Sequence, residues 1–75
     1  MKKSASDIIK ERLSYEIENS GLKKCEIAEM IGVKPTMITA YIKTKKMPSL
    51  ETFSKICLKL NLDANYVLGL RDFEN

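Results

Sequence analysis

The chain has 75 residues, 44% of them hydrophobic, and its 13 Lys and Arg residues against 10 Asp and Glu residues give a formal charge of +3. This length allows one domain, which we place at residues 1–75, with a core at about 6–69 and a tail at 70–75. The hydrophobic content is typical of a folded protein. There is no long apolar run and no signal-peptide pattern, so we expect a cytoplasmic protein without a membrane span.

The residue types give little support to catalytic or metal-binding chemistry. The chain has no His, which removes the commonest general base, and it has no paired nucleophile and base and no glycine-rich phosphate loop. Cys25 and Cys57 lie far apart in the sequence and do not make a zinc site. We expect them to be free thiols. We therefore expect that the protein is not an enzyme and that it binds no cofactor, metal or small-molecule ligand.

The first periodic segment predicts a helix over residues 6–19. Its apolar residues recur every four positions, at Ile9, Leu13 and Ile17, and such spacing places them on one face of a helix. A serine at position 4 or 6 can cap the start of this helix. This face is the first candidate for the core.

Two short amphipathic segments follow and are separated by Gly32. The first predicts a helix over residues 23–31, and the second predicts a helix that begins at Pro35 and continues to residue 43. Glycine can adopt positive φ at no steric cost, and proline suits the first helical position because its missing donor would be unpaired there anyway. Two short helices joined by a tight turn form a helix-turn-helix, whose second helix reads the DNA major groove.

Two more helices complete the pattern. After a basic loop at residues 44–47, Ser49 can cap a helix that extends to Leu60. Asp63 can cap a last helix over residues 64–68, and we expect residues 71–75 to fray. Since every periodic segment reads as a helix, the sequence predicts an all-α protein of about five short helices.

The excess positive charge is confined to the helix-turn-helix segment. Residues 23–46 contain six lysines and two glutamates, a net charge of +4, while the remaining residues carry −1, which together give the +3 of the whole chain. A basic patch on a near-neutral domain is typical of nucleic-acid binding. A solvated lysine-rich face is the alternative interpretation, but the coincidence with a helix-turn-helix favours DNA.

Two sequence motifs, which occur in the order and with the spacing typical of a known family, support a resemblance that extends over about residues 6–69. They are Leu22, Glu26-Ile27-Ala28, Ile31-Gly32-Val33 and Ile38, followed by Pro48-Ser49-Leu50-Glu51-Thr52-Phe53, Ile56, Leu60-Asn61-Leu62 and Tyr66-Val67-Leu68-Gly69. On these residues the chain resembles the phage repressor and Cro family of helix-turn-helix domains, often called the XRE family. The resemblance implies a compact five-helix bundle of the lambda repressor-like type, in which helix 35–43 enters the major groove, and a homodimer that binds two half-sites.

The resemblance also implies roles for individual residues. The base-facing positions are Pro35, Thr36, Met37, Thr39 and Ala40. The positions that would contact DNA phosphates are Lys23, Lys24, Lys34, Lys43, Thr44, Lys45 and Lys46. Because no Arg, Gln or Asn is present at the base-facing positions to make a bidentate contact, we expect modest direct readout and a contribution from DNA shape.

Three capping positions depart from the family pattern. Lys23 and Lys34 replace the usual Ser or Thr before each helix of the helix-turn-helix, so we expect the capping box between position 23 and Glu26 to be lost. Thr44 replaces the usual Gly after the recognition helix, so we expect a residue with a Cβ to accept that turn.

One pair of core positions differs from the family pattern at both of its members. Many relatives join the first helix to the end of the third by an Arg–Glu ion pair, and the matching positions here are Ile17 and Ile42. Apolar packing can replace a buried ion pair without loss of stability. We therefore predict that these two isoleucines touch in the core.

The sequence thus predicts a sequence-specific DNA-binding transcriptional regulator, a repressor of phage or mobile-element type, that binds double-stranded DNA as a homodimer. The C-terminal third has more apolar residues than one small core needs, and some of them could form the dimer seam: Leu58, Leu62, Tyr66, Val67, Leu70 and Phe73. Two alternatives remain open. The chain could be an antitoxin that also binds a toxin, or a protein-interaction module that has kept the fold and lost DNA binding.

Overall fold

The first half of the chain forms a long helix followed by two short ones. In the computed structural model, which describes residues 3–72, α1 spans Ala5–Glu18 and α2 spans Lys24–Ile31. Helix α3 spans Pro35–Thr39 and is continued by η1, a π-helical turn at Ala40–Thr44. The starts and ends of α1 and α2 lie within one residue of those predicted.

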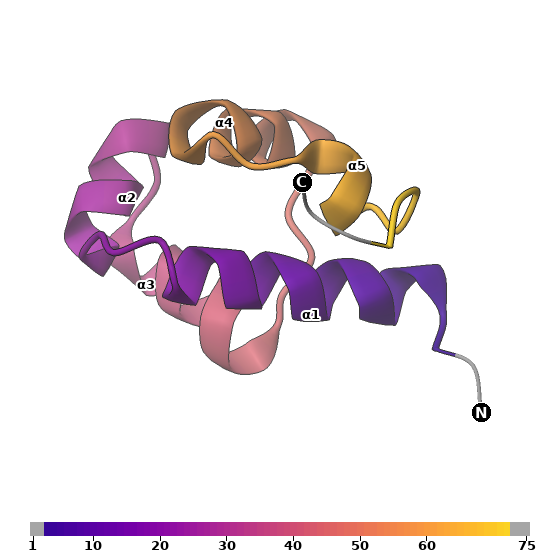
Figure 1. The fold of residues 1–75 in the computed structure, drawn as a ribbon. Helices are drawn as coiled ribbons and strands as arrows, with labels where there is room; N and C mark the ends of the chain where they lie inside the picture. The colour runs from indigo at the N-terminus through magenta and orange to yellow at the C-terminus, as the bar shows by residue number, and fades with distance from the viewer. Residues whose placement is uncertain (1–2, 73–75) are drawn as a thin grey trace.

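Helices α4 and α5 close the fold on the other side of α1. Helix α4 spans Leu50–Leu60 and α5 spans Ala64–Val67. In Figure 1, α3 lies below α1, α2 lies at its left end, and α4 and α5 lie above it. Every regular element in the described part of the chain is helical, and with η1 taken as the continuation of α3 there are five helices. The radius of gyration of 11.6 Å is close to the value of about 11 Å for a compact chain of this length, so the predicted compact five-helix bundle is confirmed.

Local capping sets most of the helix starts. Ser4, Ser49 and Asp63 each accept hydrogen bonds from backbone N–H groups two or three residues further on, at 3.1 to 3.3 Å. These bonds satisfy donors that have no partner within the helix. The predicted caps of α4 and α5 are confirmed, and Ser4 rather than Ser6 caps α1.

The turn between α2 and α3 has the geometry that its sequence predicts. Gly32 has a φ of 76° and its N–H donates to the carbonyl oxygen of Ala28 at 2.8 Å. This is the left-handed cap that commonly ends a helix. Lys34 is extended and Pro35 opens α3, so the two helices are separated by only three residues and their relative orientation is tightly restricted.

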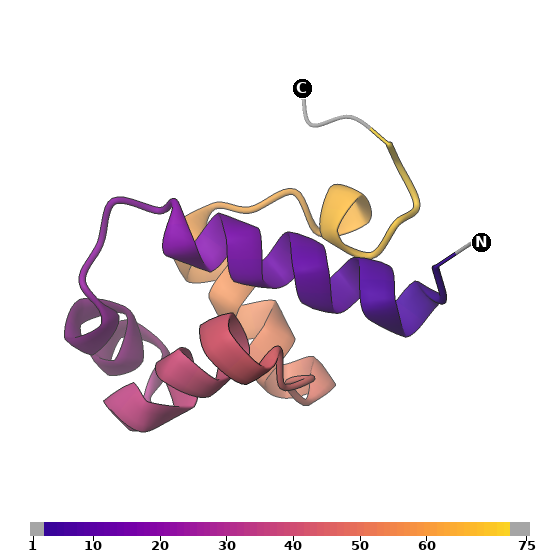
Figure 2. The ribbon, with the colours of Figure 1, turned by 90° about the horizontal axis from the view of Figure 1, so that it is seen from below.

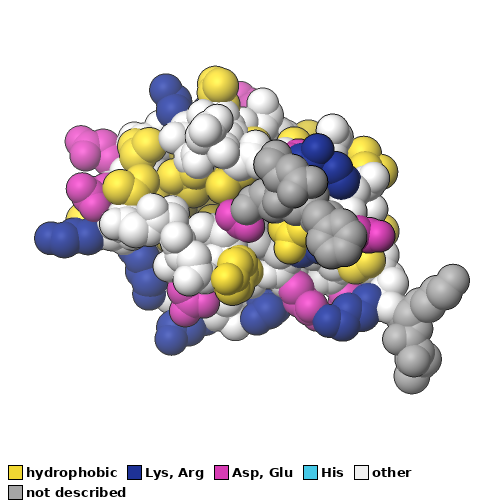
Figure 3. Space-filling view, in the orientation of Figure 1, with side chains coloured by type: hydrophobic (Ala, Val, Ile, Leu, Met, Phe, Trp, Pro, Cys, Tyr) yellow, Lys and Arg dark blue, Asp and Glu magenta, His cyan; other side chains and the backbone are white. Residues whose placement is uncertain are grey.

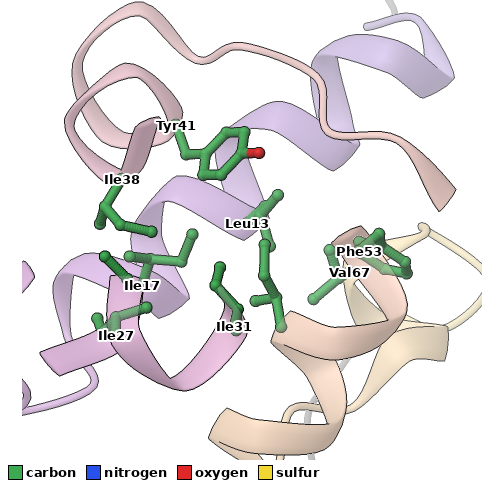
Figure 4. Close-up of a cluster of buried hydrophobic side chains, with 10 residues drawn as sticks. Leu13, Ile17, Ile27, Ile31, Ile38, Tyr41, Phe53 and Val67 are labelled. Carbon is green, nitrogen blue, oxygen red and sulfur yellow. The ribbon is translucent and has the colours of Figure 1, made fainter. Parts of the chain in front are cut away.

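The core lies between α1 and the other helices. Ten hydrophobic side chains are buried in it: Leu13, Ile17, Ile27, Ala28, Ile31, Ile38, Tyr41, Phe53, Ile56 and Val67. In Figure 4, Ile38 and Tyr41 project toward Leu13 and Ile17 of α1. Ile38 is fully buried, so α3 is held by apolar packing on one side while its other side stays open to solvent.

Ile17 and Ile42 lie on the same side of the core. Ile17 is 1% exposed, and Ile42 is partly buried and packs against the core cluster. Both side chains line one hollow between the end of α1 and the end of η1. Neither is left in solvent, which is the outcome that would have refuted the predicted pair, and their direct contact stays a prediction.

The C-terminal end is held by a contact that the sequence analysis did not predict. The Arg12 guanidinium donates from Nη1 to the carbonyl oxygens of Tyr66 at 2.6 Å and Arg71 at 2.9 Å, and it lies 4.3 Å from the centre of the Tyr66 ring. Arg71 also forms an ion pair with Asp63. The prediction that fraying begins at residue 71 is therefore wrong, because Arg71 is tied to both α1 and the start of α5. Residues 73–75, including Phe73, lie outside the described residues.

No helix among the described residues combines the length and the apolar character that crossing a membrane requires.

Candidate nucleic-acid interface

The recognition segment, which we define as α3 and η1 together, lies on the outside of the bundle. Figure 2 views the molecule from the side on which this segment lies. Pro35 and Thr36 are exposed, whereas Met37, Thr39 and Ala40 are half-buried, and Met37 packs against the core. The exposed side of the segment therefore presents small side chains at its N-terminal end. The Met37 side chain is partly in contact with the core and partly exposed to solvent.

The recognition segment does not remain α-helical over residues 35–43 as predicted. Its α-helical hydrogen bonding ends at Thr39, and the following turn, Ala40–Thr44, is a π-helix. The left-handed residue that ends it is Lys45, with a φ of 53°, and Thr44 stays helical. The prediction that Thr44 accepts the turn is therefore wrong by one residue, because the wider π-turn moves the chain reversal one position further on.

Three hydrogen bonds converge on one carbonyl at this turn. The oxygen of Ala40 accepts from the Lys45 N–H, from the Lys46 N–H at 3.1 Å, and from the Thr44 hydroxyl at 2.8 Å. Such bonds satisfy carbonyls that have no partner at the end of a helix. Together they define how the chain leaves the recognition segment.

The lysines assigned to phosphates surround the recognition segment. In Figure 3, dark-blue Lys and Arg side chains lie along the left edge, where α2 lies, and along the lower edge, where α1 lies in front of the recognition segment, with magenta acidic side chains between them. All six lysines are exposed, as is Thr44. Within residues 3–72 none of these six lysines forms an ion pair. Their positive charges are therefore available to a polyanion.

Lys24 and Lys43 are brought together from separate helices. Both line a hollow of about 150 Å³ between α1, α2 and η1, together with Glu18. Convergence of two cations from different helices suits a phosphate contact. The nearby Glu18 carboxylate would repel a phosphate, so the sequence-based charge count overstates the positive potential at this point.

The capping box of α2 is lost only in part. The Lys23 N–H donates to Glu26 Oε1 at 2.8 Å, which is one half of the motif. The reciprocal bond is missing because an ammonium group has no lone pair with which to accept a backbone N–H, and no side-chain cap forms at Lys23 or at Lys34. The predicted complete loss is wrong, because Glu26 does not depend on the residue at position 23 to make its own bond.

The remaining reactive side chains differ in their accessibility. Cys25 is an exposed free thiol, and Cys57 is a partly buried one. Burial raises the pKa of both the Cys57 thiol and the Tyr41 phenol above their ordinary values. Tyr41 is a core residue and cannot stack on a base. Among residues 3–72, no group of three or more His, Cys, Asp or Glu side chains could hold a metal ion.

The residues proposed for a dimer seam separate into two groups. Val67 is fully buried, so it belongs to the core, and Leu62 and Tyr66 are partly buried against it. Leu58 and Leu70 are 76% and 74% exposed. Leu50 is not among the residues that the sequence proposed for the dimer seam, although Leu50 is 84% exposed and lines an apolar groove of about 240 Å³ beside the loop that follows η1.

Comparison with known proteins identifies the class to which this fold and surface belong. A family model described as a helix-turn-helix domain matches residues 11–72, and the chain belongs to this family, which is of the XRE type. Membership indicates a DNA-binding regulator in general, in a family that is typically non-enzymatic. No curated protein and no solved structure gives a match.

Proposed function

We propose that this protein is a sequence-specific transcriptional regulator, a repressor of phage or mobile-element type that acts on double-stranded DNA in the cytoplasm. The observation that carries the proposal is the exposed recognition segment, flanked by lysines that form no ion pair within residues 3–72. Helix-turn-helix proteins bind by placing such a segment in the major groove. In this mechanism the core, through Ile38, holds the segment rigidly against the DNA.

Affinity is proposed to come from the lysines. Lys23, Lys24, Lys34, Lys43, Lys45 and Lys46 would neutralise DNA phosphates and release condensed counterions. This contribution does not depend on sequence and weakens as salt increases. The pair formed by Lys24 and Lys43 would contact the backbone from both sides of one hollow.

Specificity is proposed to come from the recognition segment, with Pro35, Thr36, Met37, Thr39 and Ala40 facing the bases. Threonine hydroxyls can hydrogen-bond to several bases, and the methyl groups of Thr, Ala and Met can contact a thymine methyl group. Bidentate readout is not available to these side chains, so DNA shape contributes to the choice of site.

We propose that the regulator acts as a homodimer, since two-fold symmetric binding places two recognition segments on successive half-sites. The exposed side chains of Leu50, Leu58 and Leu70 give the C-terminal half apolar surface that such an association could cover. Sedimentation equilibrium on the free protein tests this proposal. A monomer both alone and on DNA would refute it.

A mobility-shift assay separates DNA binding from the alternative function, a protein-interaction module or antitoxin that has retained the fold. We expect binding to random DNA at about 50 mM salt and a loss of roughly 10³-fold or more at about 200 mM, the range for six or more phosphate contacts. Binding that is absent at low salt would favour the interaction module.

Two matched variants test the division between affinity and specificity. The double variant Thr36→Ala, Thr39→Ala should lower discrimination between selected and random DNA more than it lowers overall affinity. Lys43→Ala should instead weaken binding to all DNA and reduce the salt slope by about one. Equal losses on selected and random DNA for both variants would contradict these roles.

A further inference from the structure

At the end of the recognition segment, the Thr44 hydroxyl already donates its proton in a hydrogen bond within the protein. Thr44 Oγ1 donates to the Ala40 carbonyl oxygen at 2.8 Å. A hydroxyl has one proton to donate, and a DNA phosphate oxygen can only accept. Thr44 would therefore have to break its bond to Ala40 in order to donate to a phosphate, although the family resemblance places it among the phosphate contacts.

The bond to Ala40 has a second consequence for the two residues that follow. The same oxygen accepts the N–H groups of Lys45 and Lys46. Lys45 occupies the left-handed region, with a φ of 53°, which residues with a Cβ adopt at a steric cost. The Thr44 hydroxyl adds a third donor to the carbonyl that holds this unfavourable conformation in place.

We propose that Thr44 is a positioning residue that acts through Lys45 and Lys46 and does not contact DNA. By fixing the π-turn, its hydroxyl sets the direction in which these two exposed lysines leave the recognition segment. The inference rests on the proposed DNA-binding function and assigns a role within it. Loss of the hydroxyl would leave both charges in the chain but release them from the surface that meets the phosphates.

Salt dependence distinguishes positioning from contact. A neutral hydroxyl that contacts a phosphate releases no counterion, so its removal lowers affinity and leaves the salt slope unchanged. Misplaced lysines stop neutralising phosphates, and each contributes about 0.9 to the slope of log affinity against log salt. Loss of two such contacts would reduce the affinity ratio between 50 and 200 mM salt by up to about 12-fold.

The experiment measures the salt slope on random DNA for the whole chain and five variants. Thr44→Val removes the hydroxyl at nearly constant shape, and Thr44→Ser retains it. Thr52→Val is the matched control, since this threonine lies in α4, outside the recognition segment and the proposed DNA contacts, and its hydroxyl accepts a hydrogen bond from the Ser49 hydroxyl. The double variant Lys45→Ala, Lys46→Ala gives the slope expected when both charges are lost. Thr44→Ala is a second hydroxyl-free variant, and it carries the test alone if circular dichroism shows that Thr44→Val is unfolded.

We expect Thr44→Val to lower the slope toward that of the double variant Lys45→Ala, Lys46→Ala. Thr44→Ser should keep the slope at the wild-type value, and Thr52→Val should leave it unchanged. A slope that Thr44→Val and Thr44→Ala leave at the wild-type value would overturn the inference, whether or not affinity falls. Failure of the unmodified chain to bind DNA in a salt-dependent way would instead overturn the proposed function, so the two failures are distinguishable.

Discussion

Arg12 provides the sharpest test of how the C-terminal end is held. Helix α5 has only four residues, too few to be stable alone, and Arg12 connects it to α1 through the carbonyls of Tyr66 and Arg71. We expect Arg12→Ala to destabilise the whole domain, because this side chain joins residues more than fifty positions apart in the sequence.

The magnitude follows from the contacts that are lost. A hydrogen bond from a charged donor contributes about 1.5–3 kcal/mol, and the part-buried bond to Tyr66 is of this kind. The bond to Arg71 is exposed and adds little. The Tyr66 carbonyl oxygen still accepts the Gly69 N–H when Arg12 is removed, so no buried acceptor is left without a partner. The contact of Arg12 with the Tyr66 ring adds about 0.5–1 kcal/mol, and we expect a total loss of about 2–4 kcal/mol.

Thermal unfolding followed by circular dichroism measures this loss. For a domain of this size, a loss of about 2–4 kcal/mol corresponds to a fall in Tm of roughly 8–32 °C. Arg12→Lys should be intermediate, because it keeps the cation but loses the planar guanidinium that stacks on the Tyr66 ring. Amide hydrogen exchange should accelerate at Leu68 and Gly69 in Arg12→Ala. A loss below about 0.5 kcal/mol, the size of an ordinary surface substitution, would refute the reasoning.

Two further predictions concern helix caps and pH. Lys23→Ser supplies the side-chain acceptor that α2 lacks and should raise the urea midpoint of unfolding. Ser49→Ala removes the cap of α4 and should lower the free energy of unfolding by about 1 kcal/mol. Equal urea midpoints for the two variants would be inconsistent with the capping argument. Because burial raises the pKa of Cys57 and of Tyr41, the unfolded chain releases these protons first. The free energy of unfolding should therefore be unaffected by them at lower pH and fall as pH rises above 9.0 for the thiol and above 10.0 for the phenol. Tyr41→Phe should remove the part of this fall that begins above 10.0, and an unchanged pH profile in that variant would count against the assignment.

Local signals allowed most helix boundaries to be predicted. Ser49 and Asp63 cap their helices through side-chain oxygens close to their own backbone, and Gly32 ends α2 because it tolerates positive φ. These effects involve residues within three or four positions of each other, so a sequence displays them directly. The recognition segment itself could be located for the same reason.

Longer-range contacts could not be predicted from these signals. From the sequence, Arg12 is recognisable only as a charged residue on a helix. Its partners Tyr66 and Arg71 are brought to it by the packing of α5 on α1. The Lys24 and Lys43 side chains likewise meet at one hollow only because α2 and η1 approach each other. Residues so far apart along the chain have no shared periodicity to reveal such contacts.

The sequence by itself determined the all-α class, the positions of the helices and the concentration of positive charge around the helix-turn-helix, because each depends on residue type and short-range spacing. Only the tertiary structure decided which recognition-segment residues face solvent, how the segment ends in a π-turn at Ala40–Thr44, and that Lys45 and not Thr44 reverses the chain. The physical reason is that burial and the choice of hydrogen-bond partner at a helix end depend on packing against the rest of the molecule.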